Sequence, residues 1–413
     1  MTIRPLAAPA QEVTWVVPGR IEVLGKHTDY AGGRSLLAAS DVGIRFAAKA
    51  IDEPVLRVRS DAIPGEVVEV SFTEAHSDRK GHWSGYPAAV AARLGANFPD
   101  LVRGTEVEIS STLPLASGMS SSSAMIVGLA RAVIDVSGIE SSEAFSDNIS
   151  TLEQYAAYLA CIENGQSFGS LAGHAGVGTF GGSEDHTAML CCTAGELSQF
   201  SFCPTRFERR VPFPADHTFV IAVSGVLAEK SGKARELYNR ASLSTREIVG
   251  MWNRATGRKD IYLASAVRSM DDAPDRIRDL LGRDSYLRGR FEQFLIESET
   301  LVRGAGDALA AGDLTEFGRL VDESQNWTEE GLQNQVQQTV YLQRLARRLG
   351  ATAASAFGAG FGGSVWALVP TAQAESFAAE WKAAYQARFE DEAPRASTII
   401  TRPGKGVERE HVA

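Results

Sequence analysis

Short segments that are rich in branched apolar residues, or that alternate apolar with polar residues, fill the first quarter of the chain and predict strands. They cover residues 14–24, 42–50, 55–59, 68–72 and 105–110. After Gly118 the apolar residues change to helical spacing: Ile126, Leu129 and Val133 fall on one face, and a second helix is expected over residues 151–163. The pattern therefore predicts a group of strands followed by a pair of helices.

The rest of the chain shows a similar separation of elements. Residues 165–182 are rich in Gly and Ser and predict a long loop, which inside a domain is often functional. A strand over residues 217–223 precedes two long helical segments, 233–256 and 291–309, and residues 351–369 predict a loop and a strand around a glycine cluster. Strands and helices in separate runs favour an α+β fold over a doubly wound sheet.

Length and composition set the domain number and exclude some partners. At 413 residues the chain is too long for one core, so we expect two domains, residues 1–214 and 215–413. The net charge of −10, without a basic run, argues against a nucleic-acid partner but allows a small anionic ligand. No apolar run is long enough to span a membrane, the N-terminus does not resemble a secretory signal, and the four cysteines form no Cys-x-x-Cys pair, so we expect a cytoplasmic protein with reduced thiols.

The most informative motif is Pro114-Leu-Ala-Ser-Gly-Met-Ser-Ser-Ser-Ser-Ala124. Small residues lead into the start of an amphipathic helix, where unpaired N–H groups and the positive end of the helix dipole attract phosphate. Serine hydroxyls can add hydrogen bonds or a metal ligand. The alternative is a serine-rich helix cap without a ligand.

Two further segments carry candidate chemistry. Residues 18–33 place Arg20 on a strand ahead of a cluster of Lys26, His27, Thr28, Asp29 and Tyr30, whose donors and acceptors suit the hydroxyls of a sugar. The alternative is a polar turn closed by two glycines. Residues 355–364 contain four glycines, which indicates close approach of the backbone to a ligand, or turns with positive φ.

Together these three segments resemble the three motifs of the GHMP kinase superfamily. Residues 18–33 are close to the galactokinase signature Gly-Arg-x-Asn-Leu-Ile-Gly-Glu-His-Thr-Asp-Tyr. Trp83-Ser-Gly-Tyr86, Tyr238-Asn-Arg240 and the segment 310–324 resemble further elements of the family in the same order. The resemblance implies a two-domain α+β fold, with an N-terminal ribosomal-protein-S5-like domain and a C-terminal ferredoxin-like α/β sandwich domain. It also implies the cofactors ATP and Mg²⁺.

The resemblance also implies roles for individual residues. Arg20 would stabilise the transferring phosphate, and Asp185, in Gly182-Ser-Glu-Asp-His186, would be the catalytic carboxylate beside the anomeric hydroxyl. The implied sugar-binding residues are Lys26, His27, Asp29 and Tyr238. The implied ATP-binding residues are Trp83, Tyr86, Pro114, Gly118, Ser120, Ser121, Ser122, Ser123, Gly358 and Gly360. Mg²⁺ would be held by Ser122 and Glu163.

Departures from the family pattern leave the acceptor open. Lys26 replaces the glutamate that contacts the far end of the sugar, Glu184 and His186 replace Met and Gln around the catalytic aspartate, and the loop before it is longer. The expected activity is phosphorylation of the anomeric hydroxyl of galactose or a related free sugar. The alternative substrate is a uronic acid, whose carboxylate Lys26 would bind.

Two other functions are weighed. A non-catalytic sensor of sugar and ATP is disfavoured by the presence of Arg20 and Asp185, and a mevalonate-type kinase or decarboxylase by the His-Thr-Asp-Tyr cluster. The expected partners are the sugar and ATP, and the chain is expected to be a monomer or a weak homo-oligomer.

Overall fold

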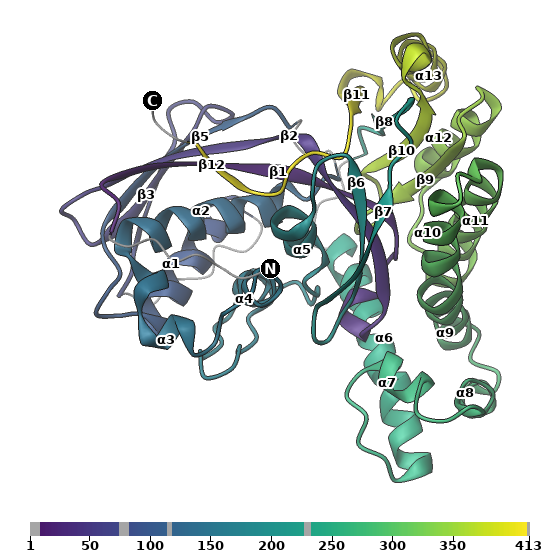
Figure 1. Ribbon diagram of the computed structural model, residues 1–413, viewed down its shortest axis with the longest axis horizontal. Coiled ribbons are helices and arrows are strands. Elements are labelled where there is room, and N and C mark those ends of the chain that lie inside the picture. Colours follow the sequence, from purple (N-terminus) through teal and green to yellow (C-terminus); the bar gives the residue numbers. More distant parts are fainter. Residues whose placement is uncertain (1–8, 74–81, 114–117, 227–232, 411–413) are drawn as a thin grey trace.

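The computed structural model describes residues 9–73, 82–113, 118–226 and 233–410, and each half of the molecule is built around one sheet (Figure 1). The larger sheet has the order β12-β1-β2-β5-β3-β4, and β6 and β7 extend it from β2. All its pairs are antiparallel except β3 with β5. Its strands are β1 (Glu12–Leu24), β2 (Arg34–Ala50), β3 (Val55–Ser60), β4 (Val67–Ser71), β5 (Thr105–Ser111), β6 (Glu196–Ser201), β7 (Arg206–Pro212) and β12 (Glu408–Glu410).

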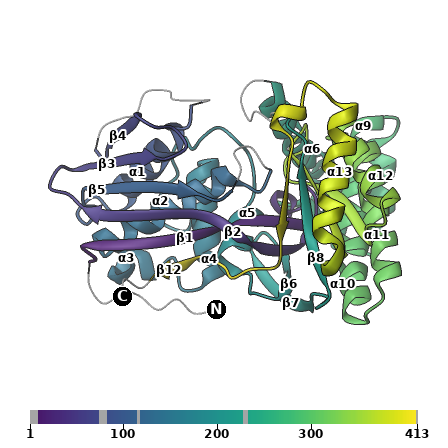
Figure 2. The same ribbon diagram turned by 90° about the horizontal axis from the view of Figure 1, so that it is seen from above.

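Helices cover one face of this sheet, as both views show (Figures 1 and 2). They are α1 (Gly85–Asn97), α2 (Ser121–Ser137), α3 (Glu143–Ser146), α4 (Leu152–Asn164) and α5 (Glu184–Cys191). Ile126, Leu129 and Val133 of α2 are completely buried, as the helical spacing predicts. At the start of α4, Thr151 forms a capping box with Gln154, which satisfies otherwise unpaired N–H groups.

The second half is an antiparallel sheet of order β11-β8-β10-β9 with helices around it. Its strands are β8 (His217–Val223), β9 (Ala353–Phe357), β10 (Ser364–Pro370) and β11 (Ser397–Thr401). Its helices are α6 (Lys233–Thr256), α7 (Leu263–Val267), α8 (Ala273–Leu281), α9 (Ser285–Ile296), α10 (Val302–Ala310), α11 (Leu314–Trp327), α12 (Gln337–Arg348) and α13 (Ala374–Arg388). Phe219, Phe317 and Trp366 from this half belong to the same hydrophobic core as the larger sheet.

The α+β, two-domain prediction is confirmed, and several segments need correction. Residues 291–309 are helical throughout, as predicted, but a π-helical turn, η3 (Glu297–Leu301), separates α9 from α10. Residues 351–369 hold two strands, β9 and β10, and not one. The domain boundary at residues 214/215 stays a prediction, and it falls where the chain passes from β7 of one sheet to β8 of the other. The chain then returns, since β12 pairs with β1.

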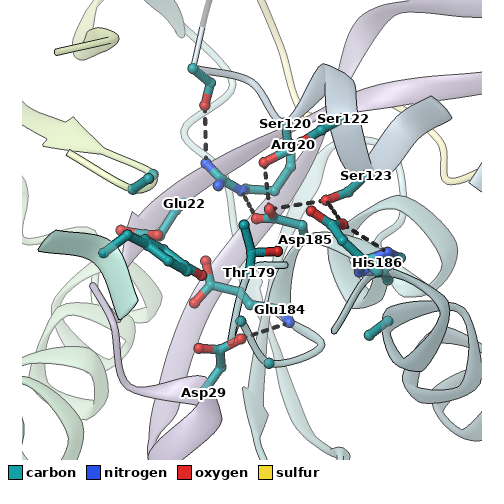
Figure 3. A pocket seen from close by; sticks show the side chains of 18 of the residues that line it. Arg20, Glu22, Asp29, Ser120, Ser122, Ser123, Thr179, Glu184, Asp185 and His186 are labelled. Atoms are coloured by element: carbon teal, nitrogen blue, oxygen red, sulfur yellow. Dashed lines mark hydrogen bonds and ion pairs between the residues drawn. The ribbon is translucent and has the colours of Figure 1, made fainter. Parts of the chain in front are cut away.

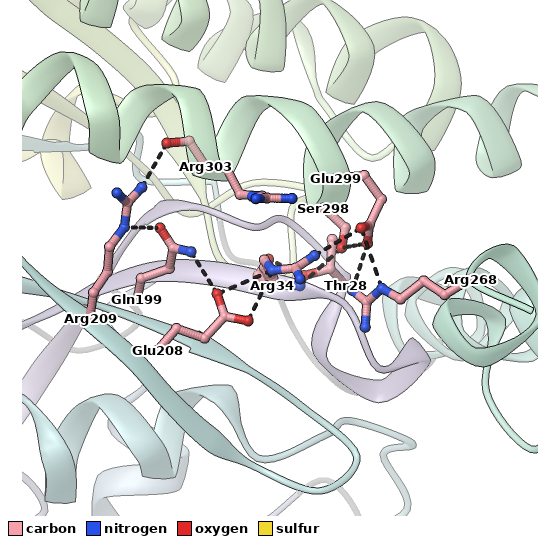
Figure 4. Close-up of polar contacts among 9 residues, drawn as sticks. All are labelled: Thr28, Arg34, Gln199, Glu208, Arg209, Arg268, Ser298, Glu299 and Arg303. Atoms are coloured by element: carbon pink, nitrogen blue, oxygen red, sulfur yellow. Dashed lines mark hydrogen bonds and ion pairs between the residues drawn. The ribbon is translucent and has the colours of Figure 1, made fainter. Parts of the chain in front are cut away.

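Charged side chains join the two halves near the end of the loop that follows β1 (Figure 4). The guanidinium of Arg34, at the start of β2, donates to Glu208 of β7 at 3.0 Å and to Glu299 of η3 at 2.9 Å. Arg268 also donates to Glu299, at 2.6 Å. The backbone N–H of Arg34 donates to Ser298 Oγ at 3.1 Å. These contacts tie the end of the loop 25–33 to β7 and η3.

No helix within the described ranges is long and apolar enough to cross a membrane.

Candidate active site

A cavity of about 220 Å³ lies where the two halves meet. Its wall combines β1, the loop that follows β1, the start of α2, the end of α4, the start of α5, Tyr238 of α6 and the glycine-rich loop between β9 and β10. The three motif segments, far apart in the sequence, therefore meet at one place. The predicted site residues that line it are Arg20, His27, Asp29, Tyr86, Gly118, Ser120, Ser121, Ser122, Ser123, Glu163, Asp185, Tyr238, Gly358 and Gly360.

Asp185 and Arg20 form the centre of this cavity (Figure 3). Arg20 Nε donates to Asp185 Oδ1 at 2.5 Å, and the hydroxyl of Ser120 donates to Asp185 Oδ2 at 2.6 Å. Ser123 Oγ lies 3.3 Å from the same oxygen. A positive charge and two hydroxyls thus fix the orientation of the carboxylate.

The start of α2 forms a cradle for an anion. Ser120 precedes the helix with φ of 58°, a left-handed conformation that is uncommon outside glycine and places its side chain against Asp185. A Cβ added to Gly358 would lie 3.2 Å from the carbonyl oxygen of Gly118, so the two glycine-containing loops approach closely. Bound phosphates are often found where the free N–H groups of a helix start face a glycine backbone that carries no side chain. The phosphate role of Gly118, Gly358 and Gly360 stays a prediction.

The predicted ATP-binding residues other than serines and glycines are Trp83, Tyr86 and Pro114. Tyr86 lines the cavity, whereas Trp83, as far as the described residues go, does not, and its indole N–H donates to Glu66 Oε1 at 2.9 Å. Pro114 lies outside the described residues.

The predicted sugar residues lie at the other end of the cavity. His27 contacts the phenol of Tyr30 through Nδ1 at 2.8 Å and the carbonyl oxygen of Ala359 through Nε2 at 3.1 Å. Burial lowers the His27 pKa to about 3, so the imidazole is neutral. Its ring packs against Tyr238, with centroids 5.2 Å apart. Asp29 accepts a hydrogen bond from the N–H of Glu184 at 3.1 Å, and burial raises the Asp29 pKa to about 6.

Lys26 is predicted to face the sugar, but its side chain makes its hydrogen bond outside the cavity. It is 1% exposed, and its Nζ donates to Ser324 Oγ of α11 at 2.9 Å. Ser324 in turn donates to Glu297 Oε1 at 3.0 Å. Within the described chain Lys26 does not border the cavity, in contrast to its neighbour His27. The reason is that η3 places the buried carboxylate of Glu297 behind the loop 25–33. Lys26 reaches this carboxylate through Ser324, and a buried negative charge is costly without a positive charge nearby.

The candidate metal ligand Glu163 lies close to Asp185. Ser123 Oγ donates to Glu163 Oε2 at 2.8 Å and also contacts Asp185, so the two acids lie side by side on the cavity wall. Oxygen ligands of this kind suit Mg²⁺, which keeps its remaining positions for phosphates and water. Glu163 and Ser122 both line the cavity and offer oxygen atoms of this kind, so they fit the ion. His186 Nε2 lies 3.5 Å from Glu163 Oε2. No cluster of three or more acidic, His or Cys ligands occurs among the described residues.

The structure adds two acids that the sequence reasoning did not place in the site. Glu22 lines the cavity two positions after Arg20, and Glu184 lines it directly before Asp185. The period of two along β1 could have revealed Glu22, because residues 20 and 22 of a strand share one face. The neighbouring Thr179 and Gly182 also border the cavity.

Comparison with known proteins identifies the class. The models for the GHMP kinases N-terminal domain and the GHMP kinases C-terminal region match residues 85–166 and 307–387. A third, the galactokinase galactose-binding signature, matches residues 7–50. The chain therefore belongs to the GHMP kinase superfamily. Within the superfamily it is a galactokinase-like sugar kinase, as the following relatives show.

The galactokinase of Chloroflexus aurantiacus is 29% identical over 372 residues, which cover 90% of this chain and 87% of the relative. The galactokinase of Lacticaseibacillus casei is 26% identical over 381 residues, which cover 89% and 87%. The crystal structure of Lactococcus lactis galactokinase complexed with galactose has a TM-score of 0.79 at 22% identity and covers 98% of this chain and 96% of that one. The crystal structure of L. major mevalonate kinase in complex with R-mevalonate has a TM-score of 0.57 at 15% identity and covers 98% of this chain and 100% of that one.

Proposed function

We propose that the chain is an ATP-dependent sugar 1-kinase, which transfers the γ-phosphate of ATP to the anomeric hydroxyl of galactose or a closely related free sugar. The observation that carries the proposal is the Arg20–Asp185–Ser120 arrangement at the junction of an anion cradle and a polar pocket. Galactokinase relatives that cover most of the chain support the sugar as acceptor.

The residues divide the reaction between them. Asp185, held through both oxygens, accepts the proton of the anomeric hydroxyl or holds that hydroxyl for in-line attack. The sugar oxygen then bonds to the γ-phosphorus, the bond to the bridging oxygen of ATP breaks, and ADP leaves with that oxygen. Arg20, permanently charged, stabilises the negative charge on the transferring group.

The two ends of the cavity position the reactants. The N–H groups at the start of α2 and its serine hydroxyls bind the phosphates. Mg²⁺, held by Glu163 and Ser122, would neutralise phosphate charge when bound. Asp29 and Tyr238 bind sugar hydroxyls, while the neutral His27 supports the pocket wall between Tyr30 and Ala359.

The uronic-acid alternative loses its support. It required the ammonium of Lys26 in the sugar pocket, and that group is bonded to Ser324 outside the cavity. The cavity is lined instead by the acids Asp29, Glu22 and Glu184, which would repel the carboxylate of a uronic acid.

The test is a screen of ADP formation with neutral hexoses, pentoses and uronic acids, with and without Mg²⁺. The proposal expects turnover with galactose or a close relative that depends on the metal. Binding of both ligands without any turnover would instead indicate the sensor function.

A further inference from the structure

Two acidic side chains, Glu22 and Glu184, meet inside the cavity. They are 3% and 4% exposed, and their carboxyl groups share a hydrogen bond. Ser35 Oγ donates to Glu184 Oε2 at 2.6 Å. Glu22 Oε1 is buried and accepts no hydrogen bond from an N–H group or a hydroxyl of the described residues. The pair therefore has acceptor capacity that the protein does not satisfy.

The position of the pair is next to the reacting groups. Glu22 lies on β1 on the same face as Arg20, and Glu184 directly precedes Asp185 at the start of α5. Figure 3 shows Glu184 between Asp185 and Asp29, with Glu22 beside it. A ligand group that contacts Glu22 and Glu184 would therefore lie between the part of the ligand at Asp185 and the part at Asp29.

Arg20 and Lys26 lie near the pair and attract it, but their hydrogen bonds go to other groups. Arg20 donates to Asp185 at 2.5 Å and to the carbonyl oxygen of Gly118 at 3.4 Å. Lys26 donates to Ser324 outside the cavity, and His27 is neutral. Burial raises the pKa of Glu22 to about 7 and that of Glu184 well above its ordinary value, so in the unliganded protein a proton holds the pair together.

Both acids also depart from the galactokinase pattern. The signature has Asn where this chain has Glu22, and the family has Met where this chain has Glu184. A sugar hydroxyl donates one hydrogen bond, for which one neutral acceptor is enough. Two adjacent carboxyl groups offer more acceptor oxygens and more negative charge than a hydroxyl requires. A primary ammonium group carries one positive charge and three donors, and therefore matches two carboxylates.

We propose that Glu22 and Glu184 form a subsite for the ammonium group of an amino sugar, which makes a 2-amino aldose the preferred acceptor. The inference rests on the sugar 1-kinase activity proposed above: with the anomeric hydroxyl at Asp185, the substituent of the adjacent ring carbon would contact the pair, because Glu184 directly precedes Asp185 on the cavity wall. On binding, the shared proton leaves to solvent, and two carboxylates contact one ammonium ion. An N-acetyl group removes both the charge and two donors, and a uronate brings a like charge.

The first test compares kcat/KM for galactosamine, galactose and N-acetylgalactosamine. The wild-type protein should prefer galactosamine over galactose by roughly tenfold or more, because a charge-assisted contact replaces a neutral one. The double variant Glu22→Asn/Glu184→Met, which restores the family residues, should lower this ratio at least roughly tenfold. Glu22→Gln and Glu184→Gln, which keep the side-chain shape, should lower it in the same direction. Glu69→Gln removes an exposed carboxylate on β4 and should leave the ratio as it is.

The second test separates the subsite from the activity. Calorimetric titration of Asp185→Asn with galactosamine and galactose, near pH 6.5 in two buffers of different ionisation enthalpy, measures affinity and proton release without turnover. Tighter binding of galactosamine with net proton release, both lost when the two acids are replaced, supports the subsite even if no sugar is phosphorylated. Equal affinity for the two sugars, or a ratio unchanged in the double variant, overturns it while leaving turnover with galactose as separate support for the kinase.

Discussion

Replacement of Lys26 by methionine tests the buried contact between Lys26 and Ser324, behind the loop 25–33. Lys26 Nζ donates to Ser324, which donates to a Glu297 that is completely buried. A hydrogen bond to a charged group contributes about 1.5–3 kcal/mol. Glu297 Oε1 keeps the N–H of Gly25 at 2.7 Å, and methionine fills the volume of the lysine stem. We therefore expect a loss of about 2–3 kcal/mol in the free energy of unfolding.

Urea unfolding, followed by circular dichroism, measures this loss. The matched control is Lys405→Met, because that lysine is 68% exposed and pairs with the exposed Glu408 on the surface. Its replacement should cost less than about 0.5 kcal/mol. Lys26→Met should also leave the ratio of kcat/KM for galactose to that for galacturonate within a few-fold. If the two variants are equally stable, or if Lys26→Met admits or rejects galacturonate selectively, the buried position of Lys26 is refuted.

Three further changes test the site. Asp185→Asn should lower kcat by about 10²–10⁴-fold, since the amide cannot accept the proton, with sugar affinity retained in a direct titration; near wild-type turnover would make Glu184 the candidate base. Ser121→Ala/Ser122→Ala should weaken Mg·ATP binding and turnover, and unchanged values would remove the phosphate role from the start of α2. Glu22→Gln should change how stability depends on pH. Because burial raises the Glu22 pKa from 4.5 to about 7, the unfolded chain loses this proton first, and stability falls as pH rises between those values. The variant should lack up to about 3 kcal/mol of that fall, and identical pH profiles of thermal unfolding would contradict the protonated pair.

Elements with a strong local pattern could be predicted from the sequence. The strand His217–Val223 and the helix Lys233–Thr256 have the bounds expected from their residues, because the strand is mostly apolar and buried throughout, and the helix contains no proline and ends at Gly257, whose φ is positive. The short hairpin of β6 and β7 was not predicted, since β7 is mostly charged and exposed. The return of β12 to β1 depends on a pairing between opposite ends of the chain, which no local pattern reveals.

In the candidate site, too, local motifs could be predicted from the sequence and contacts between distant residues could not. Residues of recognisable motifs, such as Arg20, Ser120 and Asp185, could be expected to meet, and they do. The direction of Lys26 could not be predicted, because its partner Ser324 is 298 positions away and the carboxylate behind it lies in the turn that interrupts a predicted helix. The association of Glu22 with Glu184 likewise depends on how α5 is placed over β1.

The most direct test of the sugar 1-kinase assignment is ³¹P nuclear magnetic resonance of the product formed from Mg·ATP with galactose and, separately, galactosamine. The assignment predicts one sugar phosphate for each ADP released, with its phosphorus coupled to the anomeric proton, and no product with Asp185→Asn. Release of ADP without a sugar phosphate, or a phosphate coupled to any other sugar proton, would contradict it.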